Sequence, residues 1–121
     1  MHSPMGTRAD IAAALAAMPD DDLESLRMAI DAESVFVPRL RHWLANAVDA
    51  ESGRRGGSVR ELPDPRAVIG TEDTERSLVA LAILHSTLRP FAHIAHFLDV
   101  TADALCTRAG RPGRGVPSGA S

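Results

Sequence analysis

The side chains best suited to chemistry lie in the last third of the chain. His85, His93, His96 and the single cysteine, Cys106, fall within 22 positions of one another. His93 and His96 are three residues apart and would share one face of a helix. Together with Cys106 or Asp99 they would offer ligand types that zinc accepts. The segment has no CxxC or HxxxH pair. We therefore predict no metal site, with His93 and His96 half-exposed beside a buried stripe.

No motif for covalent or phosphate chemistry accompanies these side chains. The sequence has no glycine-rich phosphate loop, no nucleophile elbow and no paired-carboxylate signature. A lone cysteine such as Cys106 is more often a small packing residue than a nucleophile. We predict no catalytic residue and no cofactor, and we expect that the protein is not an enzyme.

The residues before Cys106 follow the pattern of two short helices joined by a tight turn near Asp99. Pro90 suits the first position of one helix, and Thr101 can cap the next with its hydroxyl. Ala95 is small where a second helix would cross, and Leu98 would fill the wedge between the helices. This spacing predicts a helix-turn-helix unit within residues 90–109.

Residues 90–109 resemble the helix-turn-helix DNA-binding regulators of bacteria, with the preceding helix as a support. In that motif the second helix lies in the major groove of double-stranded DNA and turns its N-terminal residues toward the bases. The resemblance implies six DNA-binding residues here, the last of them near a phosphate: Thr101, Ala102, Asp103, Cys106, Thr107 and Arg108.

The segment that follows is a basic tail over 110–121, which we expect to be disordered. Gly110, Arg111 and Pro112, flanked by Arg108 and Arg114, resemble the core of an AT-hook. Such an arm lays arginine along the narrow minor groove of A·T tracts. The resemblance adds Arg111 and Arg114 to the DNA-binding residues.

Helices must position these residues, because the composition is rich in alanine and poor in aromatic side chains, which make up 3% of the chain. We predict an all-α protein, a small bundle of about five helices. The expected divisions are a disordered start (1–7), N-terminal helices (8–51), a Gly/Pro/Arg-rich connector (52–71) and the helix-turn-helix-like helices (72–109).

Local signals give the expected helix ends. Thr7, Asp20 and Thr71 are predicted N-caps, and Pro38 marks a boundary or a kink. Gly53 is the predicted end of the helix that carries an apolar stripe around the tryptophan. The helix over 78–88 is apolar nearly all round, so we expect it to be buried on most sides.

Charge and hydropathy exclude several classes. The net charge is −3, so the whole chain is not a polycation that coats nucleic acid. No run of 18 apolar residues predicts a membrane span, and no signal-peptide core follows the N-terminus. One cysteine excludes an internal disulfide framework. The expected location is the cytoplasm.

Two functions fit these observations. The first is DNA binding, in transcriptional regulation or in the maintenance of a mobile element. It requires arginines on the same side as the reading helix, drawn from the tail or from Arg39, Arg41, Arg54 and Arg55. The alternative is a helical protein–protein interaction adaptor without nucleic-acid binding.

The adaptor would dock a partner through an exposed apolar patch, either at the Trp43 stripe or on the helix bounded by Leu78 and Leu88. These two stretches carry more apolar surface than one small bundle obviously needs. We therefore also expect a homodimer.

Overall fold

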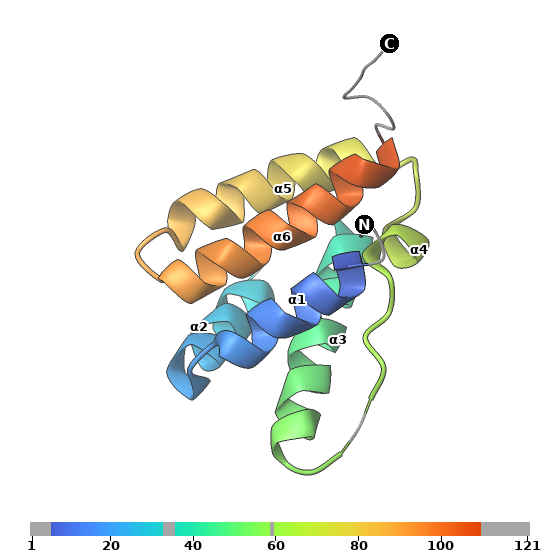
Figure 1. Ribbon diagram of the computed structural model, residues 1–121. Coiled ribbons are helices and arrows are strands. Elements are labelled where there is room, and N and C mark those ends of the chain that lie inside the picture. The colour runs from blue at the N-terminus through green and yellow to red at the C-terminus, as the bar shows by residue number, and fades with distance from the viewer. Residues whose placement is uncertain (1–5, 33–35, 59, 110–121) are drawn as a thin grey trace.

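The structure is a computed structural model that describes residues 6–32, 36–58 and 60–109, and the side chains among these except at 6–7 and 107–109. These residues form six α-helices and no strand, which confirms the all-α class (Figure 1). The helices are α1 (Gly6–Ala17), α2 (Asp20–Asp31), α3 (Pro38–Arg55), α4 (Pro65–Ile69), α5 (Thr74–Thr87) and α6 (Ala92–Ala109).

The helices share one core rather than forming two units. α5 and α6 lie side by side as a helical hairpin, and α1 lies along the other side of α6 (Figure 1). α6 also packs against α2 and α4, and a single cluster of buried apolar residues runs through both halves of the chain. The segments 8–51 and 72–109 therefore contribute to the same core, in which the first helix packs against the last.

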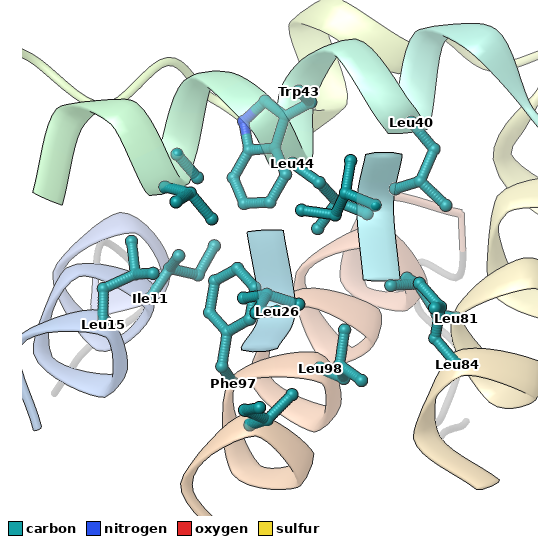
Figure 2. Packing of buried hydrophobic residues seen from close by; sticks show 14 of the residues in the cluster. Ile11, Leu15, Leu26, Leu40, Trp43, Leu44, Leu81, Leu84, Phe97 and Leu98 are labelled. Carbon is teal, nitrogen blue, oxygen red and sulfur yellow. The ribbon is translucent and has the colours of Figure 1, made fainter. Parts of the chain in front are cut away.

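Trp43 on α3 and Phe97 on α6 form the centre of this core, surrounded by leucines such as Leu26, Leu44 and Leu98 (Figure 2). Trp43 is fully buried, and its indole N–H donates a hydrogen bond of 2.8 Å to the Pro63 carbonyl. The apolar stripe around Trp43 is therefore buried inside the protein. The prediction that it docks a partner is wrong.

The segment between α3 and α5 is held at defined points. The Asp64 side chain accepts a hydrogen bond from the backbone N–H of Arg66 at 3.0 Å and so caps α4. Burial raises the pKa of Asp64, but its hydrogen bonds with Arg66 outweigh this effect and leave the pKa below its usual value. Gly70 ends α4 at φ 83° and ψ 164°, a conformation that favours glycine.

Several predicted helix ends differ from the structure. α1 already includes Gly6, so Thr7 lies inside its first turn. The N-cap of α2 is Pro19, and Asp20 lies in the first turn, where its charge favours the positive end of the helix. The N-cap of α5 is Asp73 rather than Thr71, because residues 71–73 form a turn before the helix.

α3 begins where the sequence predicts but ends later than predicted. Pro38 occupies the first turn, where the missing N–H costs no helical hydrogen bond. The helix continues past Gly53 to Arg55. The side chains of Arg54 and Arg55 turn back to a carboxylate of the preceding turn, which stabilises this last turn.

Candidate functional site

The predicted turn near Asp99 is absent, because α6 is one uninterrupted helix from Ala92 to Ala109. The Thr101 side chain is buried, and its hydroxyl donates to the Phe97 carbonyl one turn earlier at 2.9 Å. A threonine that bonds back along the helix in this way sits in the helix interior and does not cap a new one. Pro90 likewise lies in the turn before α6 and not in its first turn.

The residues implied by the helix-turn-helix resemblance do not share one exposed face. Thr101 is buried and Ala102 is half-buried, whereas Asp103 and Cys106 are exposed. The side chains of Thr107 and Arg108, and all of Arg111 and Arg114, lie outside the described residues. Without a helix N-terminus at residue 101, the backbone arrangement that turns such residues toward a groove is not formed.

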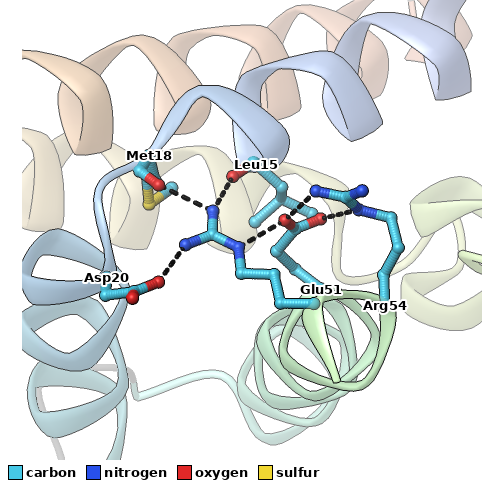
Figure 3. Close-up of polar contacts among 6 residues, drawn as sticks. Leu15, Met18, Asp20, Glu51 and Arg54 are labelled. Carbon is cyan, nitrogen blue, oxygen red and sulfur yellow. Dashed lines mark hydrogen bonds and ion pairs between the residues drawn. The ribbon is translucent and has the colours of Figure 1, made fainter. Parts of the chain in front are cut away.

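Two of the arginines that a DNA reader could draw on, Arg54 and Arg55, are engaged in ion pairs within the protein. Arg54 and Arg55 both bind the buried carboxylate of Glu51 (Figure 3), at 2.7 Å and 2.6 Å. Arg55 also donates to the Leu15 and Met18 carbonyls, at 3.0 Å and 2.6 Å. These two carbonyls lie at the C-terminal end of α1, where helical partners run out. The guanidinium of Arg55 therefore acts as a clamp between α1 and α3.

The charges of this clamp reinforce one another. The hydrogen bond from Arg54, followed by that from Arg55, lowers the pKa of Glu51 in spite of the burial of its carboxyl group. In return, the carboxylate of Glu51 raises the pKa of both arginines. The end of α3 that carries this cluster points away from the α5–α6 layer (Figure 1). The cluster therefore adds no positive charge to the outer face of α6.

The remaining arginines of α3 are Arg39, which is exposed, and Arg41. Arg39 approaches the Ile69 carbonyl at 3.4 Å and the Asp73 carboxylate at 3.9 Å. Arg41 is half-buried. On the described outer surface of α6, the charged side chains near residue 101 are the acids Asp99 and Asp103.

The clearest unpartnered surface is the outer face of α5. Val79 and Ile83 are one helical turn apart and expose 51% and 48% of their side chains. Ala82 is exposed beside them, and Leu78 is half-buried on the same side. α5 buries only its opposite face, so the expectation that it is buried on most sides is wrong. We call the set of Leu78, Val79, Ala82 and Ile83 the α5 apolar face.

This face continues into a shallow groove between α5 and α6. The groove has a volume of about 230 Å³, and its lining is mostly apolar: Leu78, Leu81, Ala82, His85, Leu98, Asp99 and Ala102. The imidazole of His85 lies 3.4 Å from the Asp99 carboxylate and links the two helices there. His85 and Asp99 are therefore the polar side chains in this lining, and they pair with each other.

A second cleft, between α2 and α3, has a volume of about 350 Å³. Its charged side chains include Arg27 and Arg55, two cations of the kind that bind an anion. Arg27 is paired with Asp49, and Arg55 is held by the clamp. Since both guanidinium groups already have carboxylate partners, the described lining of this cleft offers no unpaired guanidinium for an anionic ligand.

The histidines in the described part of the chain do not assemble a metal centre. His93 pairs with Asp22 of α2 at 3.6 Å, while His85 faces Asp99. Among the residues whose placement is described, no three histidine, cysteine or acidic side chains come together as metal ligands. In the same part of the chain, no helix has the length and apolar character that would be needed to cross a membrane.

Comparisons with protein-family models, with curated proteins and with solved structures found no match. The function is therefore argued from this geometry alone. The sequence predicted an interaction helix over 78–88 but did not identify Val79 and Ile83 as its exposed residues. The run from Ser77 to Leu84 is almost wholly apolar, so its pattern could not show which face the core would cover.

Proposed function

We propose that this chain is a cytoplasmic helical protein–protein interaction module that docks a partner on the α5 apolar face. The observation that carries the proposal is the half-exposure of Val79 and Ile83, one turn apart on a helix whose opposite face is fully packed. Burying apolar surface contributes about 25 cal/mol per Å². A partner that covers both side chains would therefore gain binding energy that the monomer leaves unused.

The position of this face suits a helical partner. Side chains at positions i, i+3 and i+4 form a ridge, and a partner helix packs its own ridge into the adjacent groove. Val79, Ala82 and Ile83 have this spacing, and the α5–α6 groove lies beside them. Exposed apolar side chains in this arrangement are typical of helix-docking surfaces.

DNA binding in a regulatory role is the competing hypothesis, and the geometry favours it less. Asp99 and Asp103 lie on the exposed side of α6, where a phosphate backbone would be repelled. Titration of the full chain against random-sequence duplex DNA at low salt tests this hypothesis directly. We expect no saturable binding; tight, salt-dependent binding would overturn the interaction-module proposal in favour of DNA.

The interaction proposal is tested by placing a photoreactive amino acid at position 83 and irradiating the protein in its source cells. The matched control places the same group at position 28, since Met28 is an even more accessible apolar residue on α2, with 64% exposure against 48% for Ile83. We expect a defined covalent product from position 83 and none from position 28. The captured chain is then purified for direct binding measurements.

In those measurements, Ile83→Ser should weaken binding by about tenfold or more, as for a central apolar contact. Met28→Ser should leave the affinity unchanged. The proposal fails if position 83 yields no product of any kind, or if Ile83→Ser binds the captured chain as tightly as the unaltered protein does.

A further inference from the structure

We infer that the partner on the α5 apolar face is a second copy of this chain, with the two α5 helices antiparallel about a two-fold axis. The inference depends on the proposed function and names the partner at that same surface. Three features of α5 support it: the spacing of its apolar pair, the small residue beside that pair, and the charges at its two ends.

The spacing of the apolar pair makes the surface complementary to itself. In a two-fold interface, each residue i that contacts residue j is matched by j contacting i. If the axis passes between Val79 and Ile83, Val79 of each copy lies against Ile83 of the other. The same contact then occurs twice across the axis, and it covers both half-exposed side chains in each copy.

Ala82 allows the two helices to approach each other closely. It is exposed on the same side as Val79 and Ile83, near the middle of the pair. Interaxial distances of about 8–10 Å depend on small side chains at the point of contact. A longer side chain at this position would hold the two backbones apart and leave Val79 and Ile83 partly exposed.

The charges at the ends of α5 select the antiparallel orientation. Glu72 and Glu75 are exposed at its N-terminal end, and Arg89 is exposed just beyond its C-terminal end. An antiparallel pair brings Arg89 of one copy near Glu75 of the other, twice, and also opposes the two helix dipoles. A parallel pair would instead bring like charges together.

The neighbouring charges do not compete for these contacts. Asp73 lies 4.0 Å from Arg76 and 3.9 Å from Arg39 within the same chain. The other strongly exposed apolar side chains lie on different elements: Met28 on α2 and Phe36 before α3, with the less exposed Phe91 before α6. Among the described residues, none of these three has a second large exposed apolar side chain one helical turn away.

The first experiment measures the oligomeric state of the full chain by sedimentation equilibrium over a concentration series. We expect a monomer–dimer equilibrium whose dissociation constant rises by at least about tenfold in Ile83→Asp. Met28→Asp, with circular dichroism as a check of folding for both variants, should leave the constant unchanged. A chain that stays monomeric up to millimolar concentration, or a dimer that Ile83→Asp does not weaken, overturns the inference.

A charge exchange tests the orientation. Arg89→Glu and Glu75→Arg should each weaken the dimer, because each places like charges across the interface. The two changes combined in one chain should restore most of the original affinity, because the opposite charges meet again with their signs exchanged. If the double variant is as weak as the sum of the single changes predicts, the antiparallel arrangement is wrong.

A cysteine at the axis tests the register. In a Cys106→Ser background, Ala82→Cys should form an intermolecular disulfide under mild oxidation, since residues beside a two-fold axis approach within disulfide reach. Met28→Cys in the same background is the control and should remain monomeric on a non-reducing gel. Equal cross-linking of the two variants overturns the register.

Failure of this inference is distinguishable from failure of the proposed function. If photo-cross-linking at position 83 captures a different protein while the purified chain stays monomeric, the face docks a partner but not a second copy. If position 83 captures nothing and the chain is monomeric, both proposals fail.

Discussion

The indole ring of Trp43 lies nearly parallel to the phenyl ring of Phe97, with ring centroids 6.1 Å apart and an interplanar angle of 7°. The first ring comes from α3 and the second from α6, so the contact joins the middle of the chain to its last described helix. Both side chains are fully buried. This pair therefore couples the stability of the two halves.

Truncation of this pair should be among the most destabilising changes in the protein. Phe97→Ala removes a buried ring and leaves a cavity against Trp43, with an expected cost of about 3–5 kcal/mol in the free energy of unfolding. Phe36→Ala is the control, because Phe36 is 54% exposed; its cost should stay within about 0.5 kcal/mol. Denaturant titration measures both. Similar costs for the two variants would contradict the central role of Phe97.

Loss of the Glu51 carboxylate from the α1–α3 clamp should make the free energy of unfolding less dependent on pH in the acid range. Glu51→Gln leaves Arg55, with 22% of its side chain exposed, with the exposed Asp20 as its one remaining carboxylate partner among the described residues, and should cost about 1–3 kcal/mol at pH 7. Because the pKa of Glu51 is lowered in the folded state, its contribution is fully present above the unfolded pKa of about 4.3. It declines as pH falls below that value and through the folded pKa.

The measurement is the difference in unfolding free energy between the unaltered protein and Glu51→Gln, followed from pH 7 to pH 3. This difference should shrink toward zero at the acid end. Glu61→Gln is the control, since Glu61 is paired with Arg8 but 84% exposed; its effect should remain below about 1 kcal/mol. A difference for Glu51→Gln that is constant across this range would show that the clamp is not electrostatic.

Two glycines should respond to alanine in opposite directions. Gly70→Ala places a Cβ at φ 83°, 3.2 Å from the Arg39 guanidinium, and should cost about 1–3 kcal/mol. Gly53 lies inside α3, and a Cβ there meets neighbours only at 3.6 Å. Gly53→Ala should therefore stabilise the protein by up to about 1 kcal/mol. Thermal unfolding of the two variants compares the signs directly, and a stabilised Gly70→Ala would refute the backbone argument.

Proline at position 102 distinguishes an uninterrupted α6 from a helix-turn-helix. In a helix capped by Thr101, residue 102 would be the first helical position, where proline is favoured. In the interior of α6, Ala102→Pro removes a helical hydrogen bond and clashes with the preceding turn, at a cost of about 3 kcal/mol or more. Ala92→Pro, at the first position of α6, is the matched control and should change stability by less than about 1 kcal/mol. If Ala102→Pro left the free energy of unfolding unchanged, the result would support a turn before residue 102.

The sequence predicts the helices of this protein better than it predicts their arrangement. The all-α class follows from composition, and the start of α3 follows from Pro38, because both are local effects. The pairing of α1 with α6 depends on contacts between residues some eighty positions apart. No local pattern encodes such a contact, so the sequence does not predict which helices of the bundle pack together.

The predicted turn near Asp99 was wrong for a related reason. Thr101 is as suitable for capping a helix as for bonding back to Phe97 inside one, and the residue type does not distinguish the two roles. In the structure the helix continues, and Phe97, Leu98 and Leu105 are all buried along it. A similar ambiguity prevented the prediction of Val79 and Ile83 as the exposed pair on α5, because nearly every residue around them is apolar.

The packing of α1 along α6 has a consequence for biosynthesis. Ile11, Ala14 and Leu15 are buried in the finished protein, yet α6 leaves the ribosome only after the five helices that precede it (Figure 1). Until then, the nascent chain exposes the apolar side of α1 without its final cover. Folding of this core should therefore wait for the synthesis of α6, and ribosome-bound chains that stop before Ala92 should be better chaperone substrates than chains that extend beyond Ala109.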